Sequence, residues 1–155
     1  MLTPSIFQQV QETFLAKVTD VNNTAFVVLK FLDVDYGGSN LAAFKGEGTR
    51  SVATEVTLKC LYKKNISDID RQKHGLSQEV MAMVYVSPLE LQQKTGSQLF
   101  PGYTMGGYAR MAVEFLGAHY EVESVVPLES QFNGNMFTCV SYQLNLKNTA
   151  GLKSY

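Results

Sequence analysis

Side chains that could act as nucleophiles or metal ligands are few in this sequence and lie far apart. The 155-residue chain contains two histidines, His74 and His119, and two cysteines, Cys60 and Cys139. A zinc site needs several Cys, His or carboxylate ligands at short, characteristic spacings, and His119 has no such neighbours. Neither cysteine has a histidine close to it in the sequence that would activate its thiol. We therefore expect no metal ion and no nucleophilic catalysis.

The carboxylates and glycines do not match the patterns of acid–base catalysis or of phosphate binding. Glu114, Glu121 and Glu123 lie near one another on a predicted hairpin, but an acid–base pair needs burial to separate its two pKa values. Their strand faces are polar, so solvated carboxylates are expected. The glycines at 46–48 lack the third glycine and the βαβ setting of a dinucleotide site, and residues 102–107 lack the Lys-Ser/Thr of a phosphate loop. We therefore expect no enzyme activity and no cofactor.

The charge balance argues against a dedicated nucleic-acid-binding protein. The chain has 13 Lys and Arg against 14 Asp and Glu, a net charge of −1, whereas nucleic-acid binders usually carry a basic surface. This charge is compatible with a protein that only lets DNA pass. Charged residues make up 17% of the chain, below the usual value of about 25%, which leaves surface for protein contacts. No apolar run approaches the roughly 20 residues of a membrane span.

The stretch from Arg110 to Lys147 is predicted to be the centre of the fold, as three strands joined by two turns. Apolar and polar side chains alternate along each strand, which is typical of a sheet with one buried and one solvated face. Turns are expected at residues 117–118 and 133–135, which contain glycine. Pro127 has no N–H to donate and is expected to end the second strand. In the third strand, Met136, Thr138, Val140, Tyr142, Leu144 and Leu146 form the expected core face, and Phe137, Cys139, Ser141, Gln143 and Asn145 the other.

The first two thirds of the chain is predicted to contain two helices and three strands. Apolar residues at helical spacing predict an amphipathic helix over Pro4–Lys17, which packs on its own domain or on a neighbouring subunit. A capping box, Ser87 with Glu90 reaching back to it, begins a short helix that Gly96 ends. The polar segment 64–77 is expected to be a solvated loop. The expected strands are Thr24–Leu32, Ser51–Lys63 and Glu79–Val86.

Two long glycine-rich segments interrupt these elements, Asp33–Arg50 and residues 97–109. Loops longer than about 12–15 residues in a compact domain are usually functional or disordered, and aromatic residues in such loops are typical of contact surfaces. Alternatively, the first segment folds back on its own sheet or forms a short hairpin, and the rings of the second cap an open end of the barrel. The candidate subunit or partner contacts are Phe44, Phe100, Tyr103 and Tyr108.

These elements predict one domain over residues 1–155. It comprises an N-terminal helix or arm (1–20), a β-barrel (24–147) and a flexible tail (148–155). The expected fold class is mainly β, a small antiparallel β-barrel or sandwich with an N-terminal helix, one short inserted helix and two long loops. The two cysteines are expected to be reduced thiols in the core.

Three segments of the second half together resemble a known family. They are EVMAMVYVSPLELQQKTG, a strand leading into the capped helix; FLGAHYEVESVVPL, a glycine turn followed by Tyr-x-Val and a polar return; and FTCVSYQLNL, the final strand after a glycine turn. The block from about Gly75 to Asn148 thereby resembles the head-completion or stopper neck proteins of tailed bacteriophages, which are head–tail connector proteins.

The resemblance implies a structural virion protein rather than an enzyme. Such a protein forms a homo-oligomeric ring in the neck, assembled in the host cytoplasm, with portal and adaptor proteins above it and tail proteins below. The ring closes the DNA-filled head, joins it to the tail, contacts packaged DNA transiently, and projects one loop from each subunit into the channel. Two alternatives remain open: a tail terminator or other joining protein, and a cytosolic small-ligand-binding barrel. The channel-loop candidates are Gly37, Gly38, Gly46 and Gly48.

Overall fold

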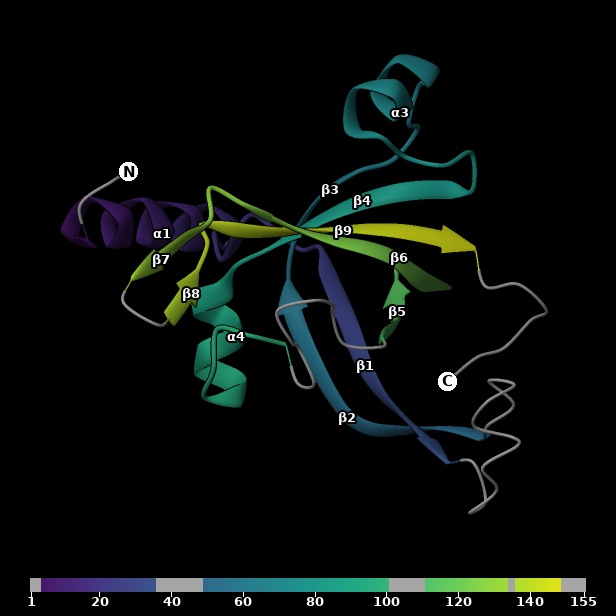
Figure 1. Cartoon of the computed structure of the whole chain (residues 1–155), viewed down its shortest axis with the longest axis horizontal. Helices are drawn as coiled ribbons and strands as arrows, with labels where there is room; N and C mark the ends of the chain where they lie inside the picture. Colours follow the sequence, from purple (N-terminus) through teal and green to yellow (C-terminus); the bar gives the residue numbers. More distant parts are fainter. Residues whose placement is uncertain (1–3, 36–48, 101–110, 134–135, 149–155) are drawn as a thin grey trace.

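Strands dominate the structure, and most of them form one curled antiparallel sheet (Figure 1). The computed structural model describes residues 4–35, 49–100, 111–133 and 136–148. Its helices are α1 (Pro4–Val18), α3 (Asp68–His74) and α4 (Pro88–Thr95), and its strands are β1 (Phe26–Asp35), β2 (Thr49–Lys59), β3 (Leu61–Lys63), β4 (Val80–Val86), β5 (Met111–Phe115), β6 (Ala118–Leu128), β7 (Gln131–Asn133), β8 (Met136–Thr138) and β9 (Ser141–Asn148). Seven strands lie in the order β2-β1-β5-β6-β9-β4-β3, and β7 pairs with β8 separately. The predicted mainly β, antiparallel fold is confirmed.

The sheet curls into a half-barrel, and its two edge strands are consecutive in the sequence. β2 forms one edge and β3 the other, with only Cys60 between them. The N–H of Cys60 donates to the carbonyl oxygen of Ala25 (3.1 Å), whereas Leu61 already pairs with Tyr85 of β4. The prediction of a single strand over Ser51–Lys63 is therefore wrong, because the chain passes from one edge of the sheet to the other within it.

The inner face of the curled sheet holds the hydrophobic core. Alternate residues of the central strands point into it, as the two-residue period of a strand requires. α4 and the segment after it add Leu91 and Phe100 to the same core. The core face predicted for the last strand is confirmed at Tyr142, Leu144 and Leu146, which are almost fully buried.

The opposite face of β9 is not solvated as predicted. Ser141, Gln143 and Asn145 are all nearly inaccessible, although their side chains are polar. β9 lies between β6 and β4, and both neighbours supply partners for it. The amide nitrogen of Asn145 donates to Ser124 Oγ (2.7 Å), and that of Gln143 donates to Asn145 Oδ1 (2.9 Å) and contacts the sulfur of Met83 (3.4 Å). These bonds offset the cost of burying polar groups, so the row is part of the packed structure.

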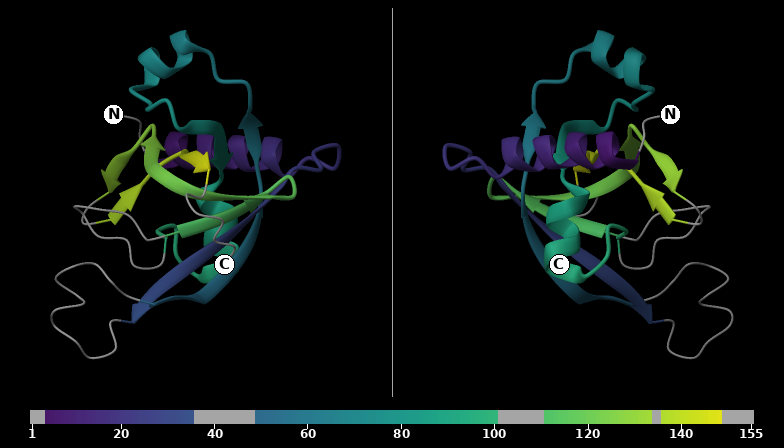
Figure 2. Two further views of the ribbon diagram at one scale, coloured as in Figure 1. Left: turned by 90° about the vertical axis from the view of Figure 1, so that its right-hand side faces the viewer. Right: turned by 90° about the vertical axis from the view of Figure 1, so that its left-hand side faces the viewer.

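α1 agrees with the predicted N-terminal helix to within one residue and packs against α4 of its own domain (Figure 2). Of the apolar residues that predicted this helix, Phe7 and Val18 are buried, whereas Val10 is 37% exposed. Gln11, a polar residue, is buried as well. The amide nitrogen of Gln11 donates to the carbonyl oxygen of Cys139 (2.8 Å) and to Gln98 Oε1 (3.1 Å). The helix is therefore held by a buried polar side chain as well as by apolar packing.

Both inserted helices begin at a serine and end at a left-handed glycine. α4 confirms the predicted short helix, with Ser87 as N-cap and Gly96 as C-cap. α3 was not predicted: the expected loop at 64–77 contains a helix with a complete capping box between Ser67 and Asp70. No residue of α3 is buried, so the segment lacks the apolar periodicity from which helices are usually predicted.

The β5–β6 hairpin turns at Leu116 and Gly117, one residue earlier than predicted. Phe115 pairs directly with Ala118. Both central residues have positive φ, 49° for Leu116 and 78° for Gly117, which is the geometry of a type I′ turn. Such a conformation is favourable for glycine and asparagine but strained for leucine.

Replacing Leu116 by asparagine is expected to stabilise the protein by about 0.5–1 kcal/mol, because asparagine adopts positive φ with less strain. Leu116 is half exposed, so little packing is lost. Urea denaturation of the variant and the parent checks this expectation. Gly117→Ala is the opposing control, because its φ of 78° disfavours any side chain, and it should be destabilising. A loss of stability in Leu116→Asn would contradict the assigned turn.

β6 continues through Pro127, which was predicted to end it. Pro127 pairs with Tyr142 of β9, whereas β5 pairs with β6 only as far as Glu121. At Pro127 the strand therefore has a described neighbour on one side only. Proline is tolerated in a strand where its missing N–H faces such an unpaired side.

The first glycine-rich segment is bounded by a long hairpin. β1 and β2 extend into the predicted loop Asp33–Arg50 and pair as far as Asp35 with Thr49. The ends of this segment are therefore paired as in a hairpin, which was one of the two predicted alternatives. Residues 36–48 lie outside the described part of the chain. The predicted turn at 133–135 is also flanked by paired strands, since Asn133 pairs with Met136.

Candidate functional site

Of the four predicted contact residues, the structure describes only Phe100, and it is buried. Its exposed fraction is 2%, and its ring lies 4.6 Å from the ring of Tyr142 and 6.1 Å from that of Phe31, between centroids. The Tyr142 hydroxyl donates to the carbonyl oxygen of Gln98 (2.8 Å), which fixes the start of the second glycine-rich segment to the core. The prediction that Phe100 is an exposed contact is wrong, because this ring fills the core at the end of the barrel. The other candidates, Phe44, Tyr103, Tyr108, Gly37, Gly38, Gly46 and Gly48, lie outside the described residues.

Glu90 of α4 is buried, with an exposed fraction of 5%, and it contacts the edge of the sheet. It was predicted to accept from the N–H of Ser87. Instead its Oε1 accepts from the backbone N–H of Lys59 at the end of β2 (2.9 Å) and lies 3.9 Å from Lys94 Nζ. Its other oxygen has no hydrogen-bond partner among the described residues. Ser87 is the N-cap of α4, as predicted. The Glu90 carboxylate, however, accepts from the N–H of Lys59, which is distant in the sequence, instead of from the N–H of Ser87.

Both cysteines are free, buried thiols, and their surroundings suppress their reactivity. Burial raises the pKa of Cys60 from 9.0 to about 12, and the nearby charge of Glu90 adds to this effect. Burial also raises the pKa of Cys139 from 9.0 to about 12, against the opposing effect of a hydrogen bond with Tyr142. A thiol must lose its proton to act as a nucleophile, so neither side chain is suited to catalysis at neutral pH.

The two thiols are expected to make the free energy of unfolding fall as pH rises from about 9 to about 12. In this window the unfolded chain releases the thiol protons while the folded chain keeps them, and below it the contribution is fully present. Denaturant titrations across this range check the slope against the double variant Cys60→Ala, Cys139→Ala, which should have a shallower slope. Equal slopes, or rapid reaction of the folded chain with a thiol reagent at about pH 8, would contradict these pKa values.

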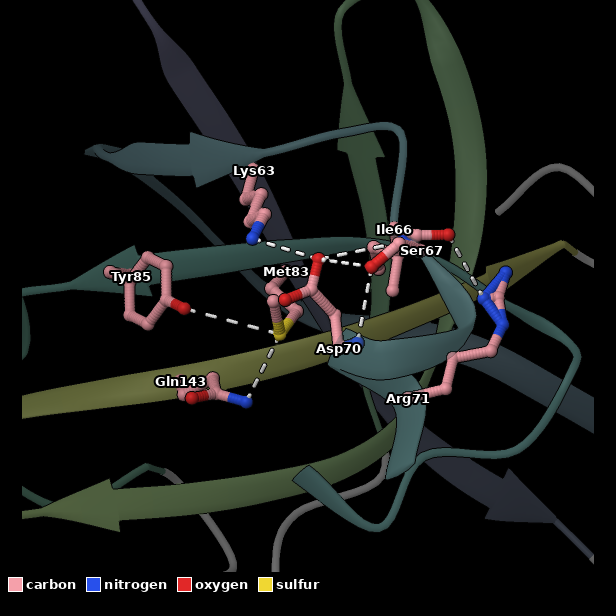
Figure 3. Close-up of polar contacts among 8 residues, drawn as sticks. All are labelled: Lys63, Ile66, Ser67, Asp70, Arg71, Met83, Tyr85 and Gln143. Atoms are coloured by element: carbon pink, nitrogen blue, oxygen red, sulfur yellow. Dashed lines mark hydrogen bonds and ion pairs between the residues drawn. The ribbon is translucent and has the colours of Figure 1, made fainter. Parts of the chain in front are cut away.

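Two cations beside or within α3, Lys63 and Arg71, have partners within the chain, and Figure 3 shows both side chains. Lys63 Nζ lies 2.8 Å from a carboxylate oxygen of Asp70, and Ser67 donates to the same oxygen. These contacts, with Lys63 first, hold the pKa of Asp70 below its ordinary value. The guanidinium of Arg71 donates to the carbonyl oxygen of Val80 (2.9 Å). α3 is therefore attached to the sheet by polar contacts, and Lys63 and Arg71 are committed to them rather than to a phosphate.

The carboxylates of the β5–β6 hairpin do not form an acid–base pair. Glu114 pairs with Lys30 on the outer face of the sheet (3.6 Å), and Glu123 accepts from the hydroxyl of Ser77. Each has a different partner and each is partly exposed, so they are not the adjacent, buried pair that acid–base catalysis needs. Among the described residues, no three His, Cys, Asp or Glu side chains come close enough to hold a metal ion.

An exposed apolar group near the β5–β6 turn was not predicted. Phe26 and Leu116 are about half exposed (48% and 51%), and Tyr62 is similar (47%). The ring of Tyr62 meets that of Phe115 edge-on at 5.1 Å, and Lys59 Nζ lies 5.7 Å from the centre of the Phe26 ring. Phe26 and Tyr62 belong to segments predicted to be strands, and Leu116 lies in the turn, so no local pattern marked these side chains as exposed.

No helix in the described ranges is long and apolar enough to cross a membrane. The chain was also compared with protein-family models, curated proteins and solved structures. None of the three comparisons found a match.

Proposed function

We propose that this chain is a structural protein of the neck of a tailed bacteriophage. In this proposal it forms a ring that closes the DNA-filled head and joins the head to the tail. The ring contacts portal or adaptor proteins on one side and tail proteins on the other, and it contacts packaged DNA only transiently. The proposal rests on the resemblance of the second half of the chain to stopper proteins.

One observation carries the proposal beyond the sequence pattern: the main strands of the three resembling segments are neighbours in the curled sheet. The segments contain β4 with α4, the β5–β6 turn with β6, and β9, and within the sheet β5, β6, β9 and β4 are consecutive neighbours. The third segment begins in β8, which pairs with β7 outside this sheet. A small curled antiparallel barrel is the fold that the resemblance implies. This agreement supports the proposal at the level of architecture.

The charge of the described surface is also compatible with a DNA channel. Phosphate contacts accumulate affinity quickly, so a channel that must release DNA is better served by a nearly neutral wall. The chain has a net charge of −1, and Lys30, Lys63 and Lys94 each lie beside a carboxylate. The proposed ring would therefore allow DNA to move through it.

Removal of the chain during infection tests the proposal. A phage that lacks it should accumulate heads and complete tails that do not join, and packaged DNA should leak from the heads. Electron microscopy and nuclease sensitivity of the lysate measure both effects, and supplying the chain from a plasmid is the control. Tails of uncontrolled length would indicate a tail terminator instead, and normal infectious particles would overturn the proposal.

A further inference from the structure

The free edge of β2 is the longest unpaired strand edge among the described residues. β2 has 11 residues and lies at the end of the sheet order, so β1 is its one neighbour among the described strands. β1 pairs with β5 on its other side only as far as Phe31, and the ladder to β2 shifts register immediately after Phe31. Beyond this point β1 and β2 continue together past β5 as a ribbon (Figure 1). A ribbon of two strands is marginally stable in water without a further strand or layer.

α4 covers this edge at one end. Lys94 Nζ donates to the carbonyl oxygen of Thr57 (2.5 Å), and Glu90 Oε1 accepts from the N–H of Lys59 (2.9 Å). Both backbone groups point away from β1, so the two side chains occupy the positions that a neighbouring strand would fill. Covering an edge with a helix is one of the ways in which proteins prevent uncontrolled strand pairing.

Among the described strands, none pairs with the rest of this edge. Backbone groups alternate along a strand, so the N–H and C=O of Glu55 point away from β1, like those of Thr57 and Lys59. The section Thr49–Glu55 contains neither proline nor lysine, the residues that most often block an edge. It carries one positive charge, Arg50, and one negative charge, Glu55, so like-charge repulsion does not oppose its pairing with an identical section.

We infer that the open edge of β2 pairs with the same edge of a second copy of this chain. The other free edge of the sheet, β3, has only three residues, so β2 is the long edge that a second copy offers. Antiparallel pairing about a two-fold axis satisfies both open edges in one contact and turns two ribbons into a four-stranded sheet. This inference goes beyond the proposed ring. A two-fold pair closes on itself, so it describes the free chain rather than neighbours within the ring.

Glu55→Pro tests the inference on the purified full chain. Proline removes an N–H that faces the open side, so the β1–β2 ladder keeps its bonds while strand addition is blocked. Sedimentation analysis should show that the parent chain dimerises, and that the variant dimerises at least about tenfold more weakly, because the lost bond occurs twice in a symmetric pair. Glu55→Gln is the matched control. It removes the charge but keeps the N–H, so it should dimerise like the parent.

Hydrogen exchange of the parent chain gives a second test that does not need the proline variant to fold. Backbone protection over residues 49–57 should rise with protein concentration. A parent chain that stays monomeric at about 100 μM, open-ended association, or a dimer whose formation leaves residues 49–57 unprotected would each overturn the inference. These results are independent of whether the chain occurs in phage particles, so failure of the dimer and failure of the neck proposal are distinguishable.

Discussion

Replacing Phe100 by alanine is expected to lower the free energy of unfolding by about 3–5 kcal/mol, the largest effect of any substitution considered. The ring is 2% exposed and packs against Tyr142 and Phe31. Its removal would leave a cavity between α4 and the inner face of the sheet, and rigid strands on one side limit how far the structure can relax into it.

Urea denaturation followed by circular dichroism measures this loss. Leu99→Ala is the matched control, because Leu99 is the adjacent residue but is only partly buried, and it should cost clearly less. A Phe100→Ala variant as stable as the parent would contradict the packing described for the end of the barrel. Because this variant disturbs the core, tests of partner contact should use Phe44, Tyr103 or Tyr108.

Replacing Glu90 by alanine is expected to lower the free energy of unfolding by about 1–3 kcal/mol. The change removes the acceptor for the N–H of Lys59, which is one of the two side-chain hydrogen bonds between α4 and the edge of β2. Glu90→Gln should cost less, because glutamine keeps a side-chain oxygen for that N–H and removes the charge of a carboxylate whose second oxygen lacks a partner.

The two Glu90 variants are compared by denaturant titration at one pH. Far-ultraviolet circular dichroism is the probe of choice, because it follows the strands directly and the chain lacks tryptophan as a fluorescent reporter. If glutamine is as destabilising as alanine, then the negative charge rather than the hydrogen bond to Lys59 holds α4 in place.

Local sequence patterns correctly predicted the elements that are stabilised by residues close to them in the sequence, such as hairpin strands and capped helices. The alternation of side chains from Arg110 onward gave the central strands, and serine and glycine caps gave α4. The same reasoning missed the break at Cys60, because apolar alternation continues from β2 into β3 while the hydrogen-bond partner changes. It also placed Gln143 and Asn145 in solvent, because burial of a polar strand face depends on neighbouring strands that are distant in the sequence.

The candidate site was less predictable than the fold. An aromatic residue in a glycine-rich segment has the same local signature whether it faces a partner or fills the end of a barrel, and Phe100 does the latter. The contact between Glu90 and Lys59 joins residues that no local motif connects. Among the described residues, the histidines, cysteines and carboxylates form no group that indicates a particular reaction. The proposed function therefore depends on a family resemblance and on architecture.

Quantitative mass spectrometry of purified tailed particles tests the proposed function most directly. The copy number of this chain is measured relative to the major capsid protein. The neck proposal predicts a few to about a dozen copies in each particle, because a closed ring fixes its copy number by symmetry. Absence of the chain from complete particles would contradict the proposal.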